Sequence, residues 1–361
     1  METLDERQSL TEEDQLFILM QAGLYLTNTR GNPSPEAHIC YEHAEPLCHS
    51  LRRPILLYLA LIGQWRFSLL TDKLSATMQI AKQVYSLAQQ QNDTAIMVGA
   101  YRALANTLYY LGDFEAAWQY AVRGVQIWRS GAVQSPPEEL HLPVVTCLCY
   151  EAASEWHLGE FSSSNAAIAE AISLAKELND MPALAQALNW AVVLGYYERD
   201  SVEVERLASD LMELSTRHHF AYFLAVGTTF RGWARSASGD VAGGIASIDD
   251  GIEQFRGIGL RTGWPLGLKA QALHLAGRTS EALAAIREAE ALVEGREECL
   301  FAELHWHRGV FLAAISADET QTEAAFCAAI RIAKEQKSIS LATRAEASYA
   351  EYRRQKGRAI D

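Results

Sequence analysis

The chain has 361 residues, enough for two or three globular domains or for one elongated array. Its 49% hydrophobic residues can supply a core, and its 21% charged residues exclude a wholly disordered chain. The net charge of −14, from 45 acidic and 31 basic residues, argues against nonspecific binding to nucleic acid or to anionic membranes, because both need a basic surface.

The first residues, METLDERQSLTEEDQLF, have neither the cationic start nor the apolar stretch of a secretory signal. We expect residues 1–12 to be disordered or to fray. The longest apolar run, Ile55 to Gly63, is about half of what a membrane-spanning helix needs. The six cysteines form no CxxC pair, which in a chain of this size indicates buried free thiols in a reducing compartment. These features predict a cytoplasmic protein with no membrane partner.

Almost the whole chain has a helical pattern, because alanine and leucine recur at spacings of three and four. Turns between helices can be read at intervals of 40, 41, 47, 40, 40, 38, 40 and 40 residues. The first residues of these turns are Gly31, Thr71, Gly112, Gly159, Arg199, Gly239, Gly277, Ala317 and Gly357. A fixed period of this length is typical of an α-solenoid, in which each hairpin buries its apolar face against its neighbours. The one long interval contains a proline-broken loop, residues 130–143.

One stretch, YYLGDFEAAWQYAVRGVQIW, resembles a tetratricopeptide repeat, whose second half runs G-D-Y-x-x-A with another small residue seven positions later. Gly112, Asp113, Phe114, Ala117 and Gly124 occupy these positions. Related patterns recur at Gly159, Phe161, Ser164 and Ala171, and at Gly277, Ala282 and Ala289. The resemblance implies an all-α fold, a right-handed α-solenoid of about eight hairpins. No linker or shift in composition divides the array, so we expect a single domain over residues 1–361. The period of about 40 residues exceeds the usual 34, so longer helices are expected.

From about Glu13 to Arg358 the chain also resembles the C-terminal repeat array of bacterial predicted ATPases, many of which are fused to cyclase or regulator domains. The segments HHFAYFLAVGTTFRGWARSASGDVAGGIASIDDGIEQFRGIG and EAAFCAAIRIAKEQKSISLATRAEASYAEYRRQKGR carry this resemblance. It implies a sensor or scaffold module that regulates an attached output domain. The chain has no GxxxxGK[ST] sequence, so ATPase or cyclase activity is not carried over.

The sequence offers no convincing catalytic or metal-binding pattern. His305 and His307 are two residues apart and Cys147 and Cys149 likewise, whereas a zinc pair on a helix needs a spacing of three or four. The glycines between 257 and 263 follow a predicted helix rather than a strand, so they indicate a connection between hairpins and not a nucleotide loop. We therefore predict no catalytic residue, no metal and no cofactor.

In tetratricopeptide arrays the first helix of each hairpin lines the concave surface, and alignment of the turns places aromatic and polar residues there. The candidate ligand-binding residues are Arg66, Arg102, Asn106, Tyr109, Tyr110, Trp156, Asn189, Tyr197, Trp233, Gln271 and His274, with Trp65, His157 and Tyr196 beside them. Arg102 and Asn106 are four apart on one helix face and resemble the basic and asparagine positions with which some family members hold a peptide carboxylate. Other hairpins lack the matching residues. The alternative is that the aromatic residues pack between hairpins, and we weigh the two evenly.

These observations favour a noncatalytic module that binds a peptide, a protein or a small signal in its concave groove, with a regulatory role in bacterial signalling. Nucleic acid is not expected as a partner. Two alternatives stay open at this point. One is an enzyme or a small-molecule-binding protein that uses the aromatic groove. The other is an assembly scaffold that associates with itself through its end repeats, since solenoids need polar caps to stay monomeric.

Overall fold

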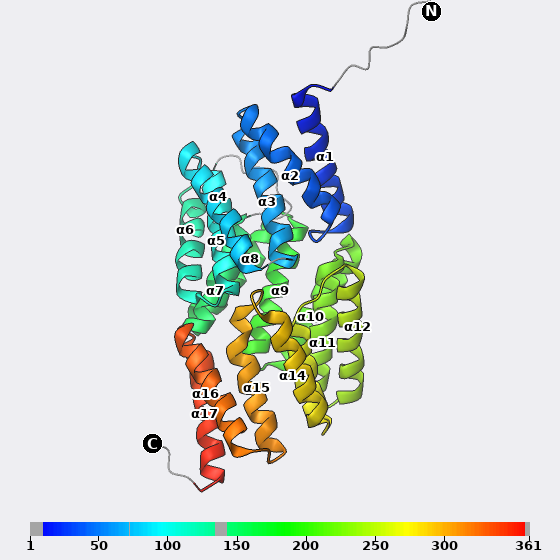
Figure 1. Ribbon diagram of the computed structural model, residues 1–361, viewed down its shortest axis with the longest axis vertical. Coiled ribbons are helices and arrows are strands. Elements are labelled where there is room, and N and C mark those ends of the chain that lie inside the picture. Colours follow the sequence, from blue (N-terminus) through cyan, green and yellow to red (C-terminus); the bar gives the residue numbers. More distant parts are fainter. Residues whose placement is uncertain (1–9, 72, 134–142, 358–361) are drawn as a thin grey trace, which may run out of the picture.

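The computed structural model describes residues 10–71, 73–133 and 143–357, and within them the chain forms α-helices, one short 3-10 helix and no strand (Figure 1). Over these described ranges, eight helical hairpins follow one another, and a single helix follows the last. The first helices are α1 (Glu12–Arg30), α3 (Pro54–Thr71), α5 (Thr94–Tyr110), α7 (Pro143–Leu158), α9 (Met181–Tyr197), α11 (Ala221–Ala237), α13 (Trp264–Leu275) and α15 (Phe301–Ala314). The second helices are α2 (Pro35–Ser50), α4 (Leu74–Gln91), α6 (Phe114–Arg129), α8 (Phe161–Glu177), α10 (Ser201–His218), α12 (Val241–Gly257), α14 (Thr279–Val293) and α16 (Glu319–Glu335). The 3-10 helix η1 (Glu298–Leu300) precedes α15, and α17 (Ile339–Gln355) comes last. The predicted α-solenoid of eight hairpins is confirmed.

The turn inside the third hairpin shows why the sequence breaks its helices where it does. Gly112 has φ +78°, and its N–H donates to Tyr109 O while Asp113 N–H donates to Leu108 O, which closes the last turn of α5. Asp113 then caps α6 by accepting a hydrogen bond from Ala116 N–H at 3.1 Å. One glycine and one aspartate thus end one helix and begin the next.

Small residues set the distance between neighbouring helices. A Cβ atom on Gly232 of α11 would lie 2.7 Å from Gly244 O of α12, so only glycine allows this approach of the two backbones. Gly124 of α6 packs in the same way against Cys147 of α7, and Ala117 is fully buried. The small positions of the predicted repeats therefore lie at helix contacts, as expected.

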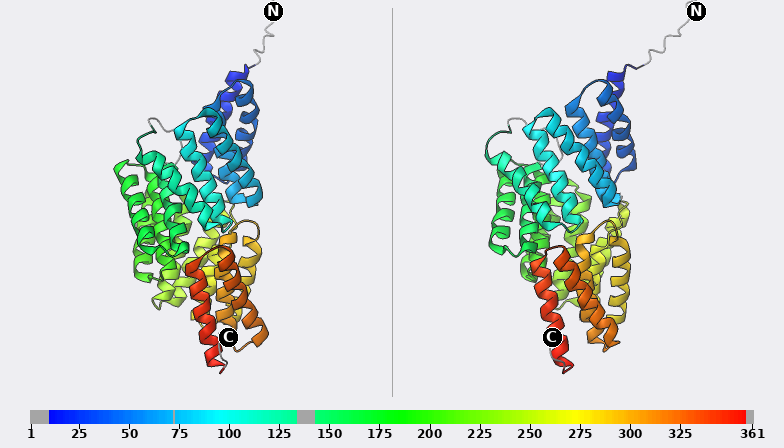
Figure 2. Two further views of the ribbon diagram at one scale, coloured as in Figure 1. Left: turned by 90° about the vertical axis from the view of Figure 1, so that its left-hand side faces the viewer. Right: turned by 60° about the vertical axis from the view of Figure 1, so that its left-hand side comes forward.

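Each first helix except α1 packs between two second helices, its own partner and that of the preceding hairpin. The final helix α17 takes a first-helix position against α16. The array also returns on itself, because α17 contacts α7, far away in sequence. Figure 2 shows the last helix, in red, next to helices from the middle of the chain, in green. His157 Nδ1 lies 2.9 Å from Ser338 Oγ, and Lys337 pairs with Glu115. A backbone hydrogen bond from Leu74 N–H to Gly295 O, at 2.8 Å, closes the chain at a second place.

One helix of the described residues, α3, is long and apolar enough to cross a membrane by length and composition. Its 44% burial between α2 and α4 is also what the core helix of an array shows. The expected fraying of residues 1–12 falls largely on residues 1–9, which lie outside the described residues, while Thr11 caps α1 through a reciprocal bond with Asp14. Most of the predicted inserted loop, residues 134–142, also lies outside them, and Pro143 begins α7.

Candidate functional site

A cavity of about 340 Å³ lies between the first helices of the N-terminal half, and we call it the groove cavity. Helices α3, α5, α7 and α9 line it, together with the end of α1 and the turn that follows it, residues 219–223 at the start of α11, and Ile258. Its polar and aromatic lining residues include Trp65, Arg66, Arg102, Asn106, Tyr110, Tyr150, Gln186, Asn189, Trp190, Phe220 and Tyr222. None of the described residues that line it is an aspartate or a glutamate. In a chain with net charge −14, this wall has an unusually positive character.

Two arginines from neighbouring helices supply that positive charge. Arg66 follows Trp65 on α3, and Arg102 lies on α5 with only 2% of its surface exposed. The Arg102 guanidinium carbon lies 5.4 Å from the centre of the Trp65 ring, within the range of a cation–π contact. The Trp65 indole is itself fixed, because its N–H donates to Thr107 Oγ1 at 3.0 Å. The structure thus holds one guanidinium rigidly at the cavity wall.

Carboxamide side chains line the middle of the groove cavity. Asn106 is 6% exposed, and its buried Oδ1 has no hydrogen-bond partner among the described residues. The indole N–H of Trp190 on α9 is likewise buried without a partner in this part of the chain. Gln186 and Asn189, three apart on α9, line the same wall. Buried polar groups of this kind are normally satisfied, so the wall has hydrogen-bonding capacity left for a ligand.

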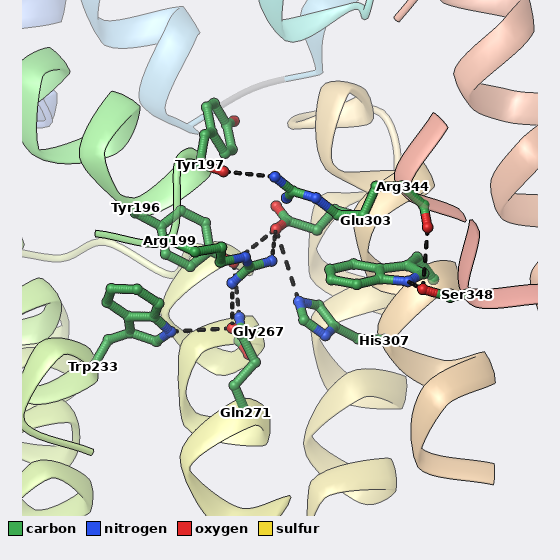
Figure 3. A network of polar contacts seen from close by, with 11 residues as sticks. Tyr196, Tyr197, Arg199, Trp233, Gly267, Gln271, Glu303, His307, Arg344 and Ser348 are labelled. Atoms are coloured by element: carbon green, nitrogen blue, oxygen red, sulfur yellow. Dashed lines mark hydrogen bonds and ion pairs between the residues drawn. The ribbon is translucent and has the colours of Figure 1, made fainter. Parts of the chain in front are cut away.

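A second, smaller cavity of about 90 Å³ lies deeper, and we call it the inner cavity. Tyr110, Asn189, Trp190 and Tyr222 line both cavities and form the wall between them. The inner cavity is bordered by Glu303 of α15 and its partners, drawn in Figure 3. Unlike the groove cavity, it is surrounded by side chains that already bind one another.

Glu303 is the centre of this network, which we call the Glu303 cluster. Its Oε1 accepts hydrogen bonds from the Tyr196 hydroxyl at 2.8 Å and from Arg199 Nη2 at 3.1 Å, and His307 Nε2 lies 3.7 Å away (Figure 3). Gln271 connects the second layer, since its Nε2 donates to the Tyr196 hydroxyl at 2.7 Å and its Oε1 accepts from Arg199 Nη1 at 2.7 Å. These residues belong to α9, α13 and α15 and to the turn after α9, so the cluster joins three hairpins.

The charges of the cluster are fixed by its surroundings. Burial alone raises the pKa of Glu303, but His307, Arg199 and Arg344 outweigh it and lower the pKa to about 2. Burial lowers the pKa of His307 to about 4, so this imidazole is neutral at pH 7. The cluster at neutral pH is therefore one carboxylate between two guanidinium groups, and Arg344 also donates to Tyr197 O at 2.6 Å.

A fully buried histidine links the inner cavity to the last helix. His157 Nε2 lies 3.2 Å from the Tyr109 hydroxyl, and its Nδ1 contacts Ser338 of α17. The ring stacks on Phe114 with centroids 3.6 Å apart, and burial lowers the pKa of His157 to about 3. Because both ring nitrogens face hydroxyl groups and the ring is neutral, this is a structural histidine.

The structure divides the eleven candidate residues into three groups. Arg66, Arg102, Asn106, Tyr110 and Asn189 line the groove cavity. Tyr109, Tyr197 and Gln271 border only the inner cavity, where they bind neighbouring side chains. Trp156, Trp233 and His274 line neither cavity. Trp156 stacks on Tyr197 at 4.4 Å, the Trp233 N–H donates to Gln271 at 3.0 Å, and His274 Nδ1 contacts Thr279 at 3.1 Å.

The turn alignment missed several lining residues because it selected the ends of the first helices. Gln186 and Trp190 lie near the middle of α9 rather than at its end. Phe220 and Tyr222 come from the connection before α11. The spacing of Gln186 three residues before Asn189 was the signal available in the sequence.

The histidine and cysteine patterns have structural explanations. His307 belongs to the Glu303 cluster, and His305 Nδ1 lies 3.6 Å from Glu290 Oε1. Within the described ranges no three His, Cys, Asp or Glu side chains are grouped as a metal site would need. All six cysteines are free, four of them buried, while Cys40 is half-buried and Cys327 exposed. The expectation of buried thiols is therefore correct for four and wrong for Cys327.

Comparison with known proteins finds one family model and several distant relatives. The model for anaphase-promoting complex subunit 5 matches residues 144–197, which is less than half of the chain. An uncharacterized protein of Rhizobium meliloti (strain 1021) is 23% identical over 343 residues, 93% of this chain. The match covers 33% of that protein, so the chain spans about a third of the length of this curated relative.

Solved structures with a similar fold include three that cover most of the chain. A Rap protein complexed with competence and sporulation factor has a TM-score of 0.65 at 10% identity, covering 96% of this chain and 94% of that one. A second structure is a signal transduction ATPase with numerous domains from Pyrococcus horikoshii, which has a tetratricopeptide repeat sensor. Its TM-score is 0.52 at 14% identity, and the match covers 98% of this chain and 51% of the Pyrococcus chain. The human IFIT1 dimer with m7Gppp-AAAA has a TM-score of 0.54 at 12% identity over 89% and 69%.

The last of these relatives bears on one expectation. The expectation that nucleic acid is not a partner rests on the acidic composition alone. The fold does not support that expectation, because a protein of this fold was solved with m7Gppp-AAAA. The resemblance to arrays of bacterial ATPases has only loose support, from the Pyrococcus structure. What the similarities do show is the fold: the chain is a tetratricopeptide-like α-solenoid.

Proposed function

We propose that the chain is a noncatalytic binding module that takes a peptide with a free carboxyl terminus into the groove cavity. The observation that carries the proposal is the composition of the cavity wall. Among the described residues it combines two arginines with the Asn106 and Trp190 groups that have no partner there, and it includes no acidic side chain. Arg66 and Arg102 suit a carboxylate, which guanidinium groups bind through charge-assisted hydrogen bonds.

The carboxamides suit the peptide backbone. Asn106, Gln186 and Asn189 each carry a donor and an acceptor on one group, the complement of a peptide N–H and C=O. Such contacts tolerate many side chains, while Trp190, Phe220 and Tyr222 offer apolar surface for one or two of them. The fixed position of Arg102 lowers the entropy that binding costs.

Peptide pools test the proposal directly. A fluorescein-labelled octapeptide pool with free carboxyl termini is titrated with the protein by anisotropy, alongside the same pool with amidated termini. We expect the free pool to bind, and Arg102→Ala and Asn106→Ala each to weaken binding at least about tenfold. Arg217→Ala, a 66% exposed arginine on the outer helix α10, is the matched control and should bind as the wild type does.

Equal binding of the free and amidated pools would exclude carboxylate recognition. Unchanged binding by both groove variants would exclude the groove cavity as the site. Turnover of a nucleotide or another substrate that single groove substitutions abolish would favour the enzyme alternative instead.

We further propose that the module acts as the sensor of a larger cytoplasmic signalling protein in bacteria. In support, the chain matches 33% of its Rhizobium relative and 51% of a Pyrococcus protein described as having a tetratricopeptide repeat sensor. A peptide that binds one arrangement of the hairpins better than another would shift the balance between them, and so would bias an attached domain.

A further inference from the structure

The inner cavity has an aromatic wall. Eight of the nineteen described residues that line it are phenylalanine, tyrosine or tryptophan, in a chain of which these residues make up 9%. They come from α5, α9, α11 and α13, so four hairpins contribute to the wall. The faces of aromatic rings carry partial negative charge, which attracts a cation. The wall therefore combines apolar surface with a preference for positive charge.

The rings of this wall hold one another in place. Trp190 meets Tyr109 edge to face, with the ring centroids 5.1 Å apart. Trp264 stacks on Phe230 at 5.0 Å, and Phe255 meets it edge to face at 5.4 Å. Because these rings already have their positions in the free protein, a ligand that binds against them costs little side-chain entropy.

The charged side chains that line the inner cavity are negative. Glu297 and Glu303 are among the described lining residues, and no lysine or arginine is. His307 lines it too, but burial lowers the pKa of this imidazole to about 4, so it is neutral at pH 7. Arg199 and Arg344, which do not line the cavity, balance the charge of Glu303 (Figure 3). The groove cavity, with two arginines and no acidic residue among its described lining, favours the opposite charge.

The carboxylate of Glu297 is held by neutral donors. Its Oε1 accepts a hydrogen bond from the Thr262 hydroxyl at 2.6 Å, and its Oε2 accepts one from Gly263 N–H at 2.9 Å. Burial raises the pKa of Glu297, and these bonds and the charge of Arg296 offset only part of that effect. A cation in the inner cavity would therefore stabilise a carboxylate whose hydrogen-bond partners are uncharged.

The hydrogen bonds that the two carboxylates already accept select the kind of cation. Both Glu297 oxygens accept a hydrogen bond, and Glu303 Oε1 accepts two. A primary ammonium group that leaves water needs new acceptors for its three N–H groups, and few are left here. A quaternary ammonium group has no N–H to satisfy, and its methyl groups pack well on aromatic faces.

The volume of the inner cavity suits such a group. A water molecule needs about 10–15 Å³ of cavity volume, so the five non-hydrogen atoms of a tetramethylammonium ion need about 50–75 Å³. The inner cavity has about 90 Å³. Tyr110 and Tyr222 are half-buried and line both cavities, which makes the groove side the route of entry.

We propose that the inner cavity binds a small quaternary ammonium compound, with its methylated head against the aromatic wall and beside the carboxylates of Glu297 and Glu303. The aromatic wall supplies most of the contact, and the carboxylates supply the selectivity for positive charge. This is a second site with its own ligand, and it does not depend on the proposed peptide site.

Isothermal titration calorimetry with tetramethylammonium chloride tests the site. We expect a dissociation constant of about 0.1–1 mM, the weak binding usual for a ligand of so few atoms. tert-Butanol has the same number of non-hydrogen atoms and no charge, while ammonium chloride supplies a cation without methyl groups. Each should bind at least about tenfold more weakly than tetramethylammonium.

Variants of the lining residues locate the site. Tyr222→Leu removes an aromatic face and should weaken tetramethylammonium binding about tenfold, whereas Tyr222→Phe keeps the ring and should bind as the wild type does. Glu297→Gln should also weaken binding at least about tenfold. Glu298→Gln, which changes a neighbouring carboxylate that does not line the inner cavity, is the matched control and should bind normally. Circular dichroism checks that each variant keeps its helices.

Three results would overturn the proposal. One is the absence of heat from tetramethylammonium binding at millimolar concentration. Another is binding of tert-butanol or of ammonium as tight as that of tetramethylammonium, because the cavity would then select shape alone or charge alone. The third is unchanged binding by both Tyr222→Leu and Glu297→Gln, which would place the cation elsewhere on the protein.

Discussion

Replacing Asn106 by leucine should make the unliganded protein more stable while destroying its peptide site. Asn106 is almost fully buried, and its Oδ1 has no hydrogen-bond partner among the described residues. A buried, unsatisfied polar atom costs about 1–3 kcal/mol, which Asn106→Leu removes. The side chain borders a cavity of about 340 Å³, so the larger leucine has room to pack without displacing its neighbours.

We expect Asn106→Leu to raise the free energy of unfolding by about 1–2 kcal/mol, measured by urea denaturation. For a chain of this length the corresponding rise in melting temperature is about 2 °C. Gln64→Leu is the matched control, because Gln64 is equally buried but donates to Tyr41 O at 3.3 Å and to Glu45 at 2.8 Å. That variant should be destabilised by about 1–3 kcal/mol. If Asn106→Leu loses as much stability as Gln64→Leu, the Asn106 amide is satisfied within the fold and the reasoning is refuted.

Three further predictions follow from the core. Glu303→Gln leaves Arg199 and Arg344 without their carboxylate. It should lower the free energy of unfolding, measured by urea denaturation, by about 3 kcal/mol. Unchanged stability would show that the cluster does not hold three hairpins together. The pKa of His307 is lowered to about 4 in the folded protein, so between pH 6.5 and 4 the unfolded chain binds a proton that the folded protein does not, and stability falls as the pH drops through this range. Between pH 7 and 5 the free energy of unfolding of the wild type should fall by about 2 kcal/mol more than that of His307→Gln. Equal losses would contradict a neutral buried imidazole. Gly232→Ala should cost about 2 kcal/mol, because its Cβ would lie 2.7 Å from Gly244 O, while the control Gly257→Ala, with open space around it, should be neutral or stabilising in thermal melts.

The order and boundaries of the hairpins could be predicted because they depend on local chemistry. Gly112, Gly159, Gly239 and Gly277 each have positive φ at a predicted turn. After Gly112 and Gly239 an aspartate caps the next helix as well. Where glycine is missing the sequence is less definite. In the eighth hairpin the left-handed residue is Ser316, one position before the predicted Ala317.

The site was predictable only in part. Arg102 and Asn106 could be paired because residues four apart share a helix face, and both line the groove cavity. The Glu303 cluster could not be foreseen, since Tyr196 and Glu303 are 107 positions apart and no period connects them. The aromatic ends of the later first helices point to the same surface in a simple array. In this structure they are buried, because α17 packs against α7 and Glu303 of α15 binds Tyr196 of α9. Both contacts join helices that are far apart in sequence.

The return of α17 onto α7 changes how the molecule should gain and lose its structure. In an open solenoid each repeat contacts only its neighbours, so the ends can melt while the middle persists. Here the contact between His157 and Ser338 spans 181 positions, and that between Glu115 and Lys337 spans 222. Hairpins four to eight are thus enclosed in a loop whose closure costs chain entropy before the contacts form. The protein is therefore a repeat array with contacts between segments far apart in sequence, and its two halves should unfold as one cooperative unit rather than fray from the C-terminus.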